Sequence, residues 1–178
     1  MNFDTDEINS RISERFAMLK NKHDVAADDK GNAMIGAHRF NIMGADYFMA
    51  DMLHDLKEIY GDGAGAIMKS TGQSYGKNIQ GVLDGADDAS EALGYDLGLL
   101  KYLGYSNISI EDDKIKVESS PTAESYKRKY DDQMKTCFFL SGVFQSLIQA
   151  HDEAASVQEA ECLADGAEKC IFRVETAQ

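Results

Sequence analysis

Positively charged residues are scarce in this chain. Its 178 residues include 31 acidic side chains against 18 lysines and arginines, which gives a net charge of −13. Proteins that bind nucleic acid need a basic surface to contact phosphates, so this balance argues against that class and against binding to an anionic membrane. No apolar run approaches the ~18 residues of a membrane span, and the first residues lack the basic and apolar regions of a signal peptide. The sequence predicts an acidic, soluble protein.

Proline and cysteine are also rare. The single proline, Pro121, leaves room for long helices. Three cysteines are an odd number and do not form tight CxxC pairs, so we expect a reducing cytoplasm rather than a disulfide framework. The length and the 43% hydrophobic content are typical of a one-domain globular protein.

Apolar spacing predicts an α+β fold, with helices packed on an antiparallel sheet made of hairpins. Consecutive helices followed by hairpins lack the alternating βα order of a doubly wound sheet. We expect helices at 4–20, 45–60, 64–83 and 89–103, a long helix from 125 to 150, and strands within 33–43, 108–119, 156–162 and 169–176.

Two of these helices carry further information. The first has Ile8, Ile12, Phe16 and Leu19 on one face, so it packs either on the body of the protein or on a second subunit. The third carries an apolar stripe and, beside it, Gly72 and Gly76 one turn apart. Glycine costs ~1 kcal/mol in a helix interior, which favours a close helix crossing here over a wall against a ligand. The stripe itself consists of Ile67, Met68, Thr71, Tyr75, Ile79 and Val82.

All three cysteines lie in the last quarter of the chain. A hairpin that turns at Gly166 places Cys162 opposite Cys170, close enough for two sulfurs to share one ion. Cys137 comes from the helix before it. Three thiolates suit zinc, which needs a fourth ligand, and Glu159 and Glu161 are the carboxylates nearest in sequence.

Strand alternation complicates this metal site. In a regular strand, Glu159 and Glu161 both point to the face opposite Cys162, so either a bulge precedes Cys162 or Glu159 faces Arg173 and is no ligand. Two simpler alternatives stay open as well. Cys137 can be an ordinary buried core residue, and Cys162 and Cys170 can form a disulfide.

The pattern of these residues resembles the 4-vinyl reductase domain family. A cysteine opens a helix with a following glycine, and Val-x-Glu-x-x-Cys leads through a glycine to Cys-x-Phe. The matching residues are Cys137, Gly142, Val157, Glu159, Cys162, Gly166, Cys170 and Phe172. The resemblance divides the chain into an N-terminal helix and loop at 1–32, as an appendage or dimer contact, and a ligand-binding domain at 33–178.

The resemblance implies a fold similar to Golgi transport-particle subunits and to ligand-binding domains of nitric-oxide signalling. It implies a homodimer and a structural zinc held by Cys137, Glu159, Cys162 and Cys170, as in phenol-sensing activators. Four protein ligands leave no open position, so such a zinc cannot activate water.

The sequence supports three functional hypotheses. The first is a non-enzymatic binding or sensor domain for an aromatic, hydrocarbon or lipid-like molecule, acting through dimerisation or a regulatory protein partner. The second is an enzyme or accessory protein in tetrapyrrole vinyl reduction, although no dinucleotide fingerprint or nucleophile–base pair is evident. The third is a dimeric scaffold without a ligand. For the sensor, the predicted ligand-binding residues are Tyr75, Phe138, Ser141, Phe144 and Val157; ordinary core packing is the alternative for its aromatic residues.

Overall fold

The computed structural model describes residues 4–22, 26–27, 33–35, 38–40, 48–80, 88–102, 104–105 and 107–176. None of the helices in these ranges is long and apolar enough to cross a bilayer. The elements are α1 (Thr5–Lys22), β1 (Ala26–Ala27), β2 (Ala33–Ile35), β3 (His38–Phe40), α2 (Met49–Tyr60), α3 (Gly63–Ile79), α4 (Ala89–Tyr102), β4 (Ile108–Glu111), β5 (Lys114–Val117), α5 (Pro121–Lys129), α6 (Phe138–Gln149), β6 (Ser156–Glu161), a 3₁₀ turn (Leu163–Asp165) and β7 (Cys170–Glu175).

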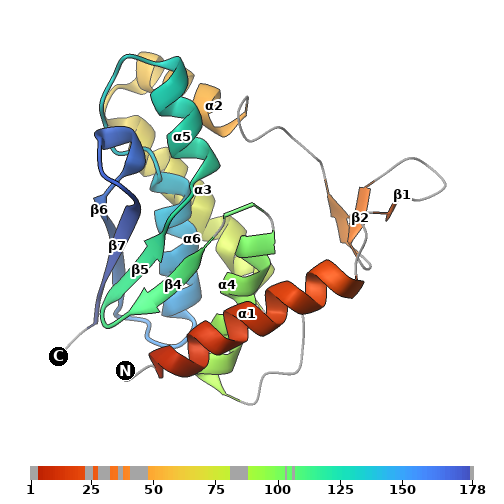
Figure 1. Ribbon diagram of the computed structural model, residues 1–178. Coiled ribbons are helices and arrows are strands. Elements are labelled where there is room, and N and C mark those ends of the chain that lie inside the picture. The colour runs from red at the N-terminus through yellow and green to blue at the C-terminus, as the bar shows by residue number, and fades with distance from the viewer. Residues whose placement is uncertain are drawn as a thin grey trace.

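A four-stranded antiparallel sheet in the order β4-β5-β7-β6 forms one layer of the fold. Helix α6 lies behind this sheet and α3 crosses α6, while α1 and α4 pack together beside β4 (Figure 1). A second antiparallel sheet contains the short strands β1, β2 and β3. This arrangement confirms the predicted α+β fold.

The predicted long helix from 125 to 150 is wrong. Helix α5 begins earlier, at Pro121, where the Ser120 hydroxyl accepts a hydrogen bond from the Ala123 N–H. It ends at Lys129, and the following residue, Tyr130, adopts an extended conformation. The segment up to Cys137 makes tertiary contacts instead of helical ones, including an ion pair between Asp132 and Lys57 on α2. Helix propensity in this charged stretch is outweighed by these contacts.

Glycines bring α3 and α6 into backbone contact. A Cβ at Gly72 would overlap the carbonyl oxygen of Phe139, and one at Gly142 would overlap the carbonyl oxygen of Lys69. The predicted close crossing is therefore confirmed.

The predicted apolar stripe of α3 is wrong in part, because Ile67 is 40% exposed and Thr71 is exposed. Val82 lies outside the described residues, and the buried stripe of α3 consists of Ala64, Met68, Gly72, Gly76 and Ile79.

Helix α1 packs on α4 of the same chain through a second pair of glycines. A Cβ at Gly94 would approach the Arg11 Cβ to 2.5 Å, and one at Gly98 would approach the Arg15 Cβ to 2.6 Å. The Asn9 side chain also pairs with the backbone N–H and C=O of Ile110, both at 2.9 Å. It therefore occupies the open edge of the sheet at β4, where an unpaired strand would otherwise be exposed.

Substitution of Gly72 by alanine tests the crossing. We expect Gly72→Ala to lower the free energy of unfolding by about 2 kcal/mol or more, because the added methyl group meets backbone rather than a flexible side chain. Gly63→Ala on the same helix is the matched control, since a Cβ there makes only an ordinary 3.8 Å contact. Urea unfolding of both variants measures the difference. Equal stabilities would contradict a tight α3–α6 contact.

Asp96 on α4 gives the fold a pH dependence. Burial raises the pKa of Asp96 to about 7, although the nearby Arg15 lowers it. A carboxyl group with a raised pKa in the folded state binds its proton more tightly there than in the unfolded chain. The free energy of unfolding should therefore fall as the pH rises from about 4 to about 7, by up to about 4 kcal/mol. Asp96→Asn should flatten this part of the stability profile, whereas Asp55→Asn at an exposed position of α2 should leave it unchanged.

Candidate metal centre and ligand site

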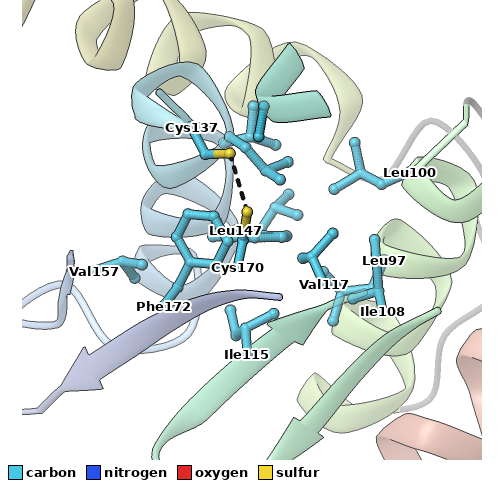
Figure 2. Packing of buried hydrophobic residues seen from close by; sticks show 14 of the residues in the cluster. Leu97, Leu100, Ile108, Ile115, Val117, Cys137, Leu147, Val157, Cys170 and Phe172 are labelled. Atoms are coloured by element: carbon cyan, nitrogen blue, oxygen red, sulfur yellow. Dashed lines mark hydrogen bonds between the residues drawn. The ribbon is translucent and has the colours of Figure 1, made fainter. Parts of the chain in front are cut away.

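Four potential metal ligands meet where α6 packs on the hairpin of β6 and β7. Cys137 immediately precedes α6, Glu159 lies on β6, Cys162 follows β6 and Cys170 begins β7. Their ligand atoms all lie within 4.8 Å of one another. Figure 2 shows the Cys137 and Cys170 sulfurs facing each other among the buried hydrophobic side chains; they are 3.5 Å apart. The structure thus brings together the four residues that the sequence predicted as ligands.

A bulge in β6 brings Glu159 and Cys162 to the same face of the hairpin. Val157 pairs with Val174 and Glu159 with Phe172, but Glu161 pairs with Ile171, so one residue is inserted at Ala160. Glu159 therefore shares the inward face of Phe172 and Cys170, and Glu161 is exposed. The bulge is confirmed, and the alternative in which Glu159 faces Arg173 is wrong because Gln158 takes that position.

The three cysteines are free and buried. The 3.5 Å between the Cys137 and Cys170 sulfurs far exceeds the ~2.05 Å of a disulfide bond. The Glu159 Oε2 atom accepts a hydrogen bond of 3.0 Å from the Cys137 N–H. Its Oε1 atom is buried and has no hydrogen-bond partner among the described residues. One carboxylate oxygen is thus held in place while the other is left without a partner.

The electrostatics of the cluster favour a bound cation. Burial, reinforced by the charge of Cys162, raises the pKa of Glu159 to about 9. The neighbouring thiols of Cys162 and Cys170, together with burial, raise the pKa of Cys137 well above its usual range. Four acidic groups this close cannot all ionise alone, because like charges in a buried site repel strongly. A metal ion would offset this repulsion and hold all four donors in their charged form.

Hydrogen-bonding groups that the sequence reasoning missed surround the sulfurs. The hydroxyl of Ser120 lies 3.2 Å from the Cys137 sulfur, and that of Thr136 lies 3.5 Å from the Cys162 sulfur. The Leu163 N–H donates to the Cys170 sulfur at 3.4 Å. Such outer contacts orient metal ligands. The position of Thr136 directly before Cys137 could have indicated that it lies near the metal ligands. Ser120 could be recognised only as the residue before a proline.

The five predicted ligand-binding residues occupy different surroundings. Ser141 and Phe144 lie on the side of α6 that faces the sheet; the Ser141 hydroxyl donates to the Val157 carbonyl at 3.1 Å, and Phe144 packs edge-on against Phe172. Both are buried, as is Val157. Phe138 is half-buried and lines a hollow of about 110 Å³ with Lys57 and Met134.

The fifth predicted residue, Tyr75, is half-buried on α3 and packs against Phe139, with 5.5 Å between the ring centroids. Tyr105, which the sequence reasoning missed, lies in the same region. Its hydroxyl hydrogen-bonds Thr122, and burial, with smaller effects of Cys137 and Tyr75, raises its pKa. Burial also raises the pKa of Tyr75. Tyr105 directly follows Gly104 between a helix and a hairpin, and this position could have marked it as a candidate ligand-binding residue.

Solved structures with a similar architecture are known. No family model matches the sequence, and no curated protein matches it either. Among solved structures, the phenol-responsive sensory domain of the transcription activator PoxR, determined with phenol, is similar with a TM-score of 0.73 and 14% identity. The alignment covers 93% of this chain and 90% of that one. This chain has a phenol-sensor-like fold.

A second similar structure is a vinyl-4-reductase family protein from Methanocaldococcus jannaschii. The TM-score is 0.53 at 16% identity, with 100% of this chain and 98% of that chain covered. The fold is therefore also 4-vinyl-reductase-like, as the motif around the cysteines indicated. At identities of 14% and 16%, the similarity to these two structures shows the fold alone.

Proposed function

We propose that this chain is a non-enzymatic sensor domain that binds a small aromatic, hydrocarbon or lipid-like molecule and is held together by a structural zinc ion. The observation that carries the proposal is the buried cluster of three thiols and one carboxylate in a phenol-sensor-like fold. The homodimer implied by the family resemblance and the regulatory protein partner of the sensor hypothesis belong to this proposal.

The donor set fits zinc. Tetrahedral zinc with Zn–S bonds of ~2.3 Å separates its sulfurs by about 3.8 Å, close to the 3.5 Å between Cys137 and Cys170. Soft thiolates select zinc over magnesium or calcium, which prefer oxygen ligands. The unpartnered Oε1 atom of Glu159 supplies a fourth donor of the right charge.

A zinc ion here would act on stability and not on chemistry. Four protein donors complete its coordination, so no position is left for water or substrate. The ion would join the start of α6 to both strands of the β6–β7 hairpin. The cysteine side chains are at most 1% exposed, which also keeps substrates away from the metal.

The proposed ligand lies near Tyr75 and Tyr105. Both side chains are half-buried and pack against the hydrophobic core together with Phe139. Burial raises the pKa of both tyrosines, which indicates hydroxyl groups withdrawn from water. Aromatic rings with a few polar groups in an apolar setting are typical of sites for small aromatic molecules. Phe138, Ser141, Phe144 and Val157 remain predicted contributors.

Metal content and stability test the zinc proposal. Native mass spectrometry should find one zinc ion per chain, and it counts subunits and retained ligand at the same time. Removal of the metal by a chelator should lower the melting temperature, because the energy of zinc binding contributes to folding. Glu159→Gln should weaken zinc binding, whereas Glu161→Gln, two residues away on the outer face, should not. Chelation without effect on stability would exclude a structural zinc.

Phenol is the probe for the ligand site, because the similar sensory domain was solved with it. Isothermal titration calorimetry should detect phenol binding to the zinc-loaded protein. Tyr105→Phe should weaken this binding by about tenfold through the loss of one buried hydrogen-bonding group. Tyr60→Phe is the matched control, since Tyr60 is 58% exposed on α2. Equal affinities of the two variants would exclude Tyr105 from the site.

A further inference from the structure

We propose that two copies of this chain associate through the outer face of α3, with the two α3 helices packed antiparallel about a two-fold axis. This face consists of Ala66, Ile67, Ser70, Thr71 and Ser74, which are all exposed. The inference rests on the homodimer of the proposed function and identifies the surface that forms it.

Exposed apolar side chains gather near the start of this face. Among the described residues, the exposed large hydrophobic ones are Phe48, Ile59, Tyr60 and Ile67, which all belong to α2, its N-cap or α3. Ile59 and Tyr60 are 69% and 58% exposed at the end of α2. A Cβ at Gly63 would lie 3.8 Å from the Tyr60 Cβ, so Tyr60 stands beside the first turn of α3. Apolar groups clustered on a surface in this way are typical of protein–protein contacts.

Two hydroxyl groups of the face already have hydrogen-bond partners within the helix. The Thr71 hydroxyl donates to the Ile67 carbonyl at 2.9 Å, and the Ser74 hydroxyl donates to the Ser70 carbonyl at 3.2 Å. Because these donors keep their hydrogen bonds when the face is covered, a second helix can exclude water from them at little cost.

Charge is confined to the two ends of the face. Between Asp62 and Lys77 the sequence contains one charged residue, Lys69. Its ammonium group donates to the Val157 carbonyl on β6 at 2.8 Å, so it points away from the outer face. Two chains that each carry a net charge of −13 repel each other wherever their acidic groups meet. An uncharged helix face is therefore a surface on which two copies can approach.

The charged residues at the ends determine the orientation of the second copy. Asp62 directly precedes α3 and Lys77 lies in its last turn, about 22 Å further along the axis at 1.5 Å per residue. Parallel packing would place like charges opposite each other. Antiparallel packing about a two-fold axis near Ser70 places Asp62 of each copy opposite Lys77 of the other, so opposite charges meet at both ends. The face is thus complementary to itself, which favours a second copy over an unrelated partner.

Charge reversal at the two ends tests this pairing. Lys77→Glu places two carboxylates opposite each other at both ends of the dimer, and Asp62→Lys places two ammonium groups there. Each variant should raise the dissociation constant of the dimer by about tenfold, measured by sedimentation velocity over a dilution series. The double variant with both substitutions should dimerise like the wild type, because opposite charges then face each other again. An equal mixture of the two single variants should form a heterodimer for the same reason.

Lys127→Glu is the control with the same change in net charge as Lys77→Glu. Lys127 is exposed on α5, outside the proposed face, so this variant should dimerise like the wild type. Ile67→Glu, within the face, should raise the dissociation constant by about a hundredfold or more, since it would bury a carboxylate without a partner. Recovery of the single variants in the mixture also shows that they are folded.

The outcomes separate this interface from the proposed function. A wild-type dimer that responds neither to Ile67→Glu nor to the charge reversals uses another surface, so the inference fails while the homodimer stands. A wild-type protein that remains monomeric at about 500 µM excludes both. Charge reversals without effect, or without recovery in the double variant and the mixture, contradict the antiparallel pairing. Zinc content and phenol binding are measured separately and do not depend on these results.

Discussion

Backbone contact between α3 and α6 determines where the candidate metal centre can form. Gly72 and Gly142 remove the side chains that would hold these helices apart, so α6 is fixed between α3 and the sheet. Cys137 stands at the start of α6 and is therefore fixed with it. The other three donors come from the hairpin on which α6 packs. A small shift of the helix would move one sulfur away from the other two.

The β6–β7 hairpin contributes the second constraint. A regular β6 would place Glu159 on the opposite face from Cys162, and the extra residue at Ala160 corrects this mismatch. Bulges of this kind occur beside functional sites because they redirect one side chain without disturbing the rest of the sheet. Here Glu159 faces inward by regular alternation with Val157, and the bulge after it turns Cys162 to the same face.

Much of the fold was predictable from spacing. The hairpin of β4 and β5 alternates buried Ile108, Ile110, Ile115 and Val117 with polar residues, and period-two patterns of this kind are strong local signals. The break between α5 and α6 was not predictable, because it depends on contacts such as Asp132 with Lys57, seventy-five positions apart. The buried face of α3 was also misjudged, since glycines carry no hydrophobic signal although they make its closest contacts.

The sequence by itself determined the acidic composition, the α+β class, and three cysteines and a glutamate at a recognisable spacing. Only the tertiary structure decided that these four groups meet and that Glu159 and not Glu161 faces inward. The physical reason is the range of the interactions. Alternation and helix periodicity act between near neighbours, whereas a shared metal site depends on how α6, β6 and β7 pack and on a register shift of one residue.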